Sequence, residues 1–233
     1  MRNYLLFSFI WITIPLSAQQ QTILPRDETR MDASLAAFVV DLRKAIAEQE
    51  GNWIISVLDE DVVSSFGDEP GIPSFLRYWA PEGNETSFWP YLHRVVELGG
   101  VFLHDDADQS GKYQFVFPYV YDTDVSEDND YYLLGVVTGK NVNLRKAPDT
   151  QSEVITQLSY NLIYYNWEPE SDALVASGKN PYGGAMWYFV KTRDKKHEGW
   201  INWNYVYPVG GPRLFLYKNA DDEWKISAFV AGD

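Results

Sequence analysis

The 233-residue chain contains no cysteine. This absence excludes disulfide bonds, thiolate metal sites and a cysteine nucleophile. Histidine is scarce as well, with three residues, and no Gly-x-Ser-x-Gly nucleophile motif occurs. We therefore predict a protein that is not an enzyme and that holds neither a metal ion nor a cofactor.

Basic residues are few, with 19 Lys and Arg against 33 Asp and Glu. Neutralising phosphates needs a basic surface, so this balance argues against nucleic acid as a partner. The excess of acid lies in residues 25–130, which hold 7 basic and 22 acidic residues, whereas residues 131–233 hold 11 of each. The step in charge follows the acidic run 122–130 and predicts a domain boundary near residue 130.

The N-terminal apolar run, Leu5–Leu16, is too short to span a bilayer as a helix. It follows a basic residue and ends in Leu-Ser-Ala, which indicates a signal peptide over residues 1–18 with cleavage after Ala18. We expect the mature chain to be exported, to the periplasm or the exterior, with no stable membrane span after cleavage. Its core must then form without disulfides, and an aromatic content of 16% provides apolar surface to bury.

The first part of the mature chain has helical periodicity. Asp32 is placed as an N-cap before apolar residues at helical spacing, which are Leu35, Phe38, Val39, Leu42 and Ile46. Shorter helices are predicted over residues 53–58, 75–79 and 88–98, and strands over 101–103 and 113–121. Residues 25–130 are thus expected to form an acidic α+β domain, with its helices first and a small antiparallel sheet.

The period changes in the second part of the chain. Residues 133–207 contain short apolar runs separated by Gly, Pro and Asn, which is typical of a small all-β barrel. Residues 208–212 read as a linker, and residues 213–217 and 224–230 as a C-terminal β-hairpin. Two strands alone are marginally stable. We therefore expect residues 208–233 to pack on the N-terminal domain, with addition to the barrel as the alternative.

Several motifs follow one another in a fixed order between residues 137 and 206. They are Val142-Asn-Leu-Arg145, Pro148, Val154 with Leu158, Trp187-Tyr-Phe-Val190 and Gly199-Trp-Ile201. This order resembles the bacterial SH3 (SH3b) family. The resemblance implies an SH3b-type barrel over residues 131–207 that binds a cell-wall peptide. The insertion at residues 171–184 departs from the family pattern and could cover the usual groove.

The remainder of the chain carries a weaker resemblance. Segments 42–47, 53–58 and 65–67, together with the C-terminal hairpin, are similar to an uncharacterised family of exported bacterial proteins that contain SH3b domains. Helices first and a hairpin last are also similar to NTF2-like cone folds, which implies a small-molecule pocket between the helices and the sheet of the N-terminal domain.

The barrel region provides the candidate ligand contacts. Its aromatic residues offer broad apolar faces with polar tips, which suit peptides and sugars. Trp187 and Trp200 stand at structural positions of the family and are expected in the core, as are Val142, Leu144, Val154 and Leu158. Arg145 could bind a ligand carboxylate or pair with Asp149 or Glu153 at the turn. The predicted ligand-binding residues are Arg145, Tyr160, Asn161, Tyr164, Trp203 and Tyr205.

Three functional hypotheses remain open on the sequence. The first is a non-catalytic cell-envelope binding protein whose SH3b module contacts a peptide, peptidoglycan or a protein partner. The second places a small-molecule pocket or an enzymatic activity in an NTF2-like N-terminal domain. The third is a scaffold with no small ligand, whose acidic N-terminal domain meets a basic envelope protein. A loop at residues 106–111 resembles half of a calcium site, but Phe117 stands where the second half needs Glu, so we interpret it as a hairpin loop.

Overall fold

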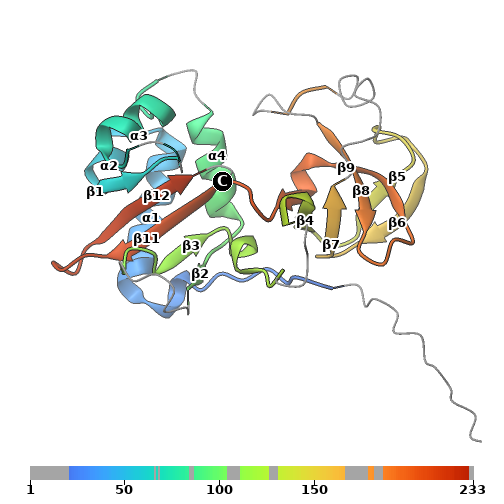
Figure 1. The fold of residues 1–233 in the computed structure, drawn as a ribbon, viewed down its shortest axis with the longest axis horizontal. Coiled ribbons are helices and arrows are strands. Elements are labelled where there is room, and N and C mark those ends of the chain that lie inside the picture. Colours follow the sequence, from blue (N-terminus) through green and yellow to red (C-terminus); the bar gives the residue numbers. More distant parts are fainter. Residues whose placement is uncertain are drawn as a thin grey trace, which may run out of the picture.

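The structure is a computed structural model that describes residues 21–65, 67, 69–83, 87–103, 111–125, 131–165, 178–180 and 186–230. The expected signal peptide and most of the calcium-like loop and of the 171–184 insertion lie outside these residues. The chain is α+β, with helices followed by two sheets that lie side by side (Figure 1). We call the unit of helices and first sheet the N-terminal unit, and the second sheet with its loops the second unit.

Within the described residues, the N-terminal unit contains four α-helices: α1 (Ala33–Glu48), α2 (Gly51–Ser56), α3 (Ile72–Trp79) and α4 (Phe88–Glu97). The start of α1 confirms the predicted N-cap, because the Asp32 carboxylate accepts the Leu35 N–H at 2.8 Å. The helix ends at Gln49, whose backbone is left-handed with φ 53°. Four short 3₁₀ turns complete the helical elements: η1 (Thr29–Met31), η2 (Tyr119–Asp122), η3 (Tyr131–Leu133) and η4 (Trp203–Tyr205).

The first sheet has five strands in the order β1-β12-β11-β3-β2. They are β1 (Leu58–Val63), β2 (Val101–Phe102), β3 (Phe115–Phe117), β11 (Arg213–Lys218) and β12 (Trp224–Val230). The prediction of an antiparallel sheet was wrong in one respect, because β1 pairs parallel to β12 and the sheet is therefore mixed. The helix predicted over residues 53–58 ends at Ser56, and Leu58 already belongs to β1.

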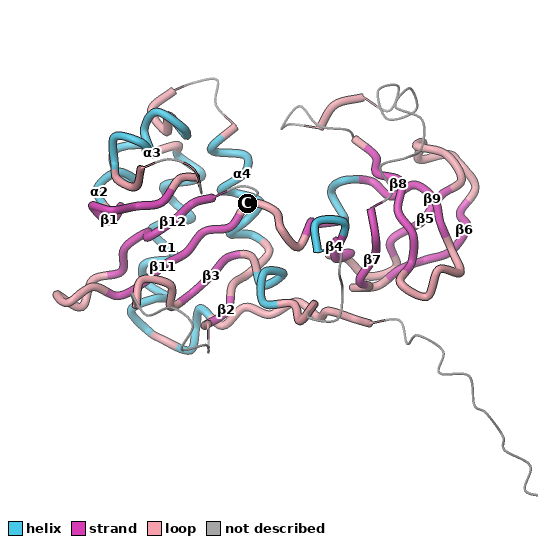
Figure 2. The backbone as a smooth tube through the Cα atoms, in the orientation of Figure 1, coloured by secondary structure: helices cyan, strands magenta, loops and turns pink. Residues whose placement is uncertain are grey.

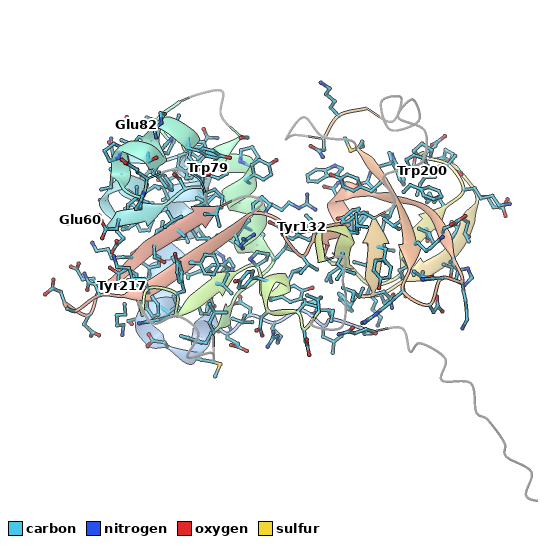
Figure 3. The ribbon with its side chains drawn as sticks, in the orientation of Figure 1. Glu60, Trp79, Glu82, Tyr132, Trp200 and Tyr217 are labelled. Atoms are coloured by element: carbon cyan, nitrogen blue, oxygen red, sulfur yellow. The ribbon has the colours of Figure 1, made fainter. Side chains whose placement is uncertain are left out.

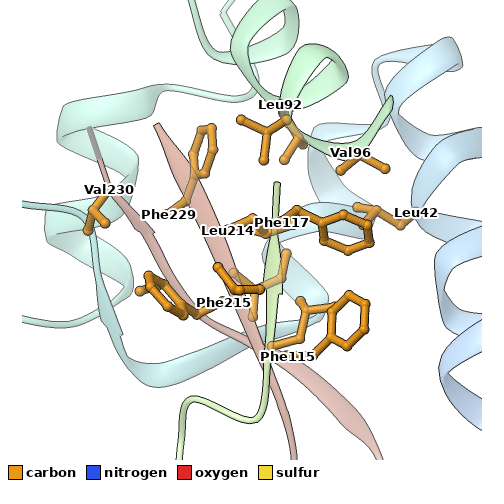
Figure 4. Close-up of a cluster of buried hydrophobic side chains, with 14 of the residues drawn as sticks. Leu42, Leu92, Val96, Phe115, Phe117, Leu214, Phe215, Phe229 and Val230 are labelled. Carbon is orange, nitrogen blue, oxygen red and sulfur yellow. The ribbon is translucent and has the colours of Figure 1, made fainter. Parts of the chain in front are cut away.

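The C-terminal hairpin occupies the middle of the first sheet. Its strand β12 lies between β1 and β11, and β11 lies between β12 and β3. Helices α1 and α4 cover one face of this sheet, where their apolar side chains meet those of β3, β11 and β12 (Figure 4). The core of the N-terminal unit is thus built from chain segments at both ends of the sequence.

The second sheet has seven strands, all antiparallel, in the order β10-β4-β7-β8-β9-β5-β6. They are β4 (Leu134–Val137), β5 (Val142–Arg145), β6 (Val154–Leu158), β7 (Leu162–Tyr165), β8 (Trp187–Thr192), β9 (Glu198–Asn202) and β10 (Val206–Pro208). Among the described strands no ladder joins β10 to β6, so the expected closed barrel is replaced here by an open sheet.

One of the predicted core residues of this sheet is exposed. Val142, Leu144 and Leu158 are buried, and so are Trp187 and Trp200, as expected. Val154, by contrast, keeps 41% of its surface exposed. It begins β6, the strand at the edge of the sheet, and pairs only with Arg145 of β5 within the described ladders. Directly opposed residues point to the same face of a sheet, and Arg145 lies on the face of β5 opposite to the core residues Val142 and Leu144.

The two units share a continuous hydrophobic core. Strands β4, β7 and β10 of the second sheet, together with the residue that follows β10, contribute side chains to the same buried cluster as the helices and the first sheet. The contributing residues are Leu134, Val136, Leu162, Tyr207 and Val209. Burying apolar surface stabilises a contact by about 25 cal/mol per Å². The packed interface therefore opposes independent movement of the two units.

Residues 21–28 form a strap that contacts both units (Figure 2). At its start, Ile23 donates its N–H to the Tyr160 carbonyl at 2.7 Å, and Gln21 accepts the Leu162 N–H at 3.0 Å. At its end, the N–H of Glu28 bonds to the Gly100 carbonyl at 2.8 Å. The strap thus ties the second sheet to the segment between α4 and β2. Within the described residues, no helix has the length and apolar character needed to cross a membrane.

Candidate binding groove

A groove of about 370 Å³ opens on the second unit. Its walls come from the segment before β5, from β5 itself, from the turn after it, from the start of β8, the end of β9, and η4. The lining residues are Lys140, Asn141, Val142, Asn143, Arg145, Thr150, Trp187, Asn202, Asn204 and Tyr205. The groove therefore collects residues from positions 140–150 and 187–205 of the sequence.

Among the residues that the structure describes, the lining contains cations, amides and aromatic rings but no carboxylate. Lys140 and Arg145 supply positive charge, and four asparagines supply amide donors and acceptors. The chain as a whole has a net charge of −14, whereas the described lining of the groove carries a net positive charge. It favours ligands with negative charge and hydrogen-bonding groups.

Alternation along β5 places two polar side chains in the groove. Val142 and Leu144 point into the core, and Asn143 and Arg145 lie on the opposite face. The amide nitrogen of Gln157 donates to Asn143 Oδ1 at 2.9 Å, which fixes the orientation of that amide. The period of two in Val-Asn-Leu-Arg would have identified Asn143, which the sequence analysis did not single out.

Arg145 is held by the turn that follows β5. Its Nη1 donates to the Ser152 carbonyl at 2.6 Å, so the expected pairing with Asp149 or Glu153 is not the observed contact. The Glu153 carboxylate instead pairs with Lys146 at 2.7 Å. The bond to Ser152 uses one of five guanidinium N–H groups. Arg145 is thus anchored at one nitrogen while it lines the groove.

The aromatic residues of the groove have different exposures. Trp187 at the start of β8 is 6% exposed and is part of the packed sheet, as its structural role in the SH3b pattern predicts. Tyr205 in η4 is 51% exposed. The first ring is a fixed surface within the groove, and the second is accessible to an incoming ligand.

The other predicted ligand contacts lie outside this groove. Tyr160 bonds through its carbonyl to the strap, and Asn161 is buried, with its Oδ1 accepting the Ser159 N–H at 2.7 Å. Tyr164 packs against the core shared by the two units. Trp203 is 7% exposed and lies beneath Arg94 of α4. The structure therefore brings together Arg145 and Tyr205 of the six predicted residues.

A second polar cluster lies on the first sheet, where Asp59 of β1 is buried. Lys112 donates to Asp59 Oδ1 at 2.7 Å, and the Tyr217 hydroxyl of β11 donates to Oδ2. Burial acts to raise the pKa of Asp59, but the bonds from Lys112 and Tyr217 outweigh it and the pKa is lowered. Burial and the bond to Asp59 raise the pKa of Tyr217 to about 12. A phenol held in its protonated form is a structural donor, since a nucleophile or base would need a lowered pKa.

Replacing Tyr217 with Phe is expected to lower the free energy of unfolding by about 1–2 kcal/mol at neutral pH, because a hydrogen bond to a carboxylate is lost. A tyrosine whose pKa is raised in the folded state stabilises the fold fully below its ordinary pKa of 10.0, and this contribution disappears as pH rises through about 12. The difference between the wild type and Tyr217→Phe, measured by urea unfolding, should therefore shrink between pH 10 and 12. A difference that stays constant over this range contradicts the assignment.

Comparisons with known protein families, with curated proteins and with solved structures return no match. The SH3b and NTF2-like resemblances therefore stay predictions based on the sequence. Within the residues that the structure describes, no group of three or more His, Asp or Glu is placed to hold a metal ion.

Proposed function

We propose that the protein is a non-catalytic cell-envelope binding protein whose groove takes a carboxylate-bearing envelope peptide such as those of peptidoglycan. One observation carries the proposal: the described lining of the groove combines Lys140 and Arg145 with no acidic residue, on a chain of net charge −14. Cationic side chains form short, strong hydrogen bonds with carboxylates. The asparagines match the amide groups of a peptide, which need both donors and acceptors.

The sequence pattern supports the same proposal from another side. We interpret the seven-stranded sheet as an SH3b-type module whose family pattern supplies β5, β6, β8 and β9. The signal peptide expected over residues 1–18 would deliver the mature chain to the compartment that holds peptidoglycan. The expected export and the chemistry of the groove thus both favour a peptide of the cell envelope as the ligand.

Tyr205→Ala is expected to reduce retention of the mature protein on purified peptidoglycan sacculi by about tenfold, because it removes an accessible aromatic contact at the edge of the groove. Tyr78→Ala is a matched control, since Tyr78 lies on α3 of the N-terminal unit and its 49% exposure is close to the 51% of Tyr205. Retention is measured by co-sedimentation over a series of protein concentrations. Equal retention of the wild type and Tyr205→Ala would overturn the proposal.

A second arm of the experiment tests recognition of charge. Sacculi whose carboxylates have been converted to amides should retain the wild type about tenfold less well than untreated sacculi, because Lys140 and Arg145 lose their counter-charges. Lys140→Ala should bind both kinds of sacculi with a smaller difference between them. Undiminished retention on amidated sacculi would contradict recognition of the carboxylates.

A further inference from the structure

Arg94 reaches from the N-terminal unit to the backbone of the second unit. It lies on α4, and its Nη2 donates to the carbonyls of Trp203 and Val206, each at 2.6 Å. Its guanidinium carbon stands 4.4 Å from the ring centroid of Trp203 and 5.2 Å from that of Tyr207. Helix α4 lies on the side of the N-terminal unit that faces the second sheet (Figure 1). Arg94 thus contacts the η4 region through both hydrogen bonds and ring faces.

The 3₁₀ turn η4 contacts Arg94 through one residue and lines the groove with the other two. Trp203 at its start is buried under Arg94, whereas Asn204 and Tyr205 line the groove. The turn is closed locally by two bonds: Asn202 Oδ1 accepts the Asn204 N–H at 3.1 Å, and the Trp203 carbonyl accepts the Val206 N–H. That same Trp203 carbonyl accepts from Arg94. Arg94 and the Val206 N–H therefore donate to the same acceptor, the Trp203 carbonyl oxygen.

We propose that Arg94 is a positioning residue that holds η4 in place and thereby sets the Asn204–Tyr205 wall of the groove from the other structural unit. Three residues form the turn, so a bond at Trp203 and another at Val206 fix it at both ends. Charge-assisted bonds are roughly twice as strong as neutral ones. The consequence for ligand binding rests on the function proposed above, whereas the mechanical coupling does not.

The role requires arginine in particular. A planar guanidinium can stack on an aromatic ring while its N–H groups point to acceptors in the same plane. A lysine ammonium is a compact point charge without a planar face. Arg94→Lys should therefore keep the charge of the interface but lose most of the contacts that fix η4, which are the ring stacking and the paired hydrogen bonds.

The coupling is tested by NMR amide exchange of the full mature protein. In Arg94→Met, the amides of Asn204, Tyr205 and Val206 should exchange at least about tenfold faster than in the wild type, because loss of even one of the two charge-assisted bonds corresponds to about that factor. Arg94→Lys should give a smaller increase at the same amides, and it serves as the test if Arg94→Met does not fold. Arg43→Met is the control, because Arg43 on α1 pairs with Asp27 and Glu97, away from η4. Unchanged exchange at η4 in both Arg94 variants overturns the proposal.

Retention on peptidoglycan sacculi separates this inference from the proposed function. Arg94→Met should lose about three- to tenfold in retention although Arg94 does not line the groove. Suppose that the wild type is retained more strongly than Tyr205→Ala but no more strongly than Arg94→Met. In that case the positioning role is wrong and the groove function stands. If the wild type is not retained at all, the groove function fails, and the exchange rates alone decide whether Arg94 holds η4.

Discussion

A chain that ends after Gly210 is expected to lose the folded structure of its N-terminal unit. It lacks β11 and β12, which are the two strands between β1 and β3 in the first sheet. Without them, β1 has no partner and the helices lose the sheet face on which they pack. The deleted segment also carries fully or almost fully buried apolar side chains, which are Leu214, Leu216, Ile226, Phe229 and Val230.

The size of the effect follows from the burial of these side chains. Each buried Leu, Ile, Val or Phe contributes about 1.5–3 kcal/mol relative to an exposed one. Five such residues together contribute about 7.5–15 kcal/mol, which is of the same size as the net stability of a typical domain, about 5–15 kcal/mol. Near-UV circular dichroism and thermal unfolding of the truncated chain should show loss of the aromatic signal of Trp79 and Trp89 and no cooperative transition from the N-terminal unit.

The full mature chain is the control, and it should unfold cooperatively under the same conditions. Persistence of the native near-UV spectrum in the truncated chain would show that the hairpin is an accessory element. It would contradict the placement of β11 and β12 at the centre of the sheet.

Trp79→Ala is expected to destabilise the protein by about 3–5 kcal/mol, the range for truncation of a buried aromatic residue. The Trp79 ring lies 4.5 Å from the Phe229 ring, between centroids, and 6.1 Å from that of Phe88. Its indole N–H also donates to the Phe229 carbonyl at 2.8 Å in a buried setting. The substitution therefore leaves a cavity between α3, α4 and β12 and removes the indole donor from the Phe229 carbonyl. Trp79 is labelled in Figure 3.

Urea unfolding of three variants separates the two contributions. Trp79→Phe keeps most of the ring volume but removes the indole donor, and should cost about 1–3 kcal/mol. Tyr78→Ala, next to it in α3 and half exposed, should cost less than about 1 kcal/mol. A cost below about 1 kcal/mol for Trp79→Ala would mean that this ring does not join α3 to the sheet.

Local patterns in the sequence predicted the elements whose stability is local. Helix α1 follows from apolar residues at helical spacing and from Asp32 at its cap. Strand β1 escaped prediction because Leu58 is followed by three acidic residues, a composition unfavourable for strands. What makes it a strand is parallel pairing with β12, which lies at the far end of the chain. Such a contact leaves no signal in the residues near β1.

The predicted site residues also fall into two groups, those that line the groove and those that distant parts of the chain cover. Arg145 and Tyr205 lie within residues 137–206, the motif region that resembles the SH3b pattern, and the structure places both in the groove. Tyr160 and Asn161 are covered by the strap, and Trp203 by Arg94. These covering groups come from residues 21–23 and from α4, outside the motif region. Reading the motif by itself therefore overestimated how much of its aromatic surface is accessible.

The central claim, that the groove binds a carboxylate-bearing peptide, is tested most directly by NMR titration of the mature protein with soluble peptidoglycan fragments. We expect chemical-shift changes concentrated at Asn143, Arg145, Asn204 and Tyr205 and at the Trp187 indole, and much weaker changes with fragments whose carboxylates are amidated. Shift changes confined to the N-terminal unit, or equal changes with both kinds of fragment, would contradict the claim.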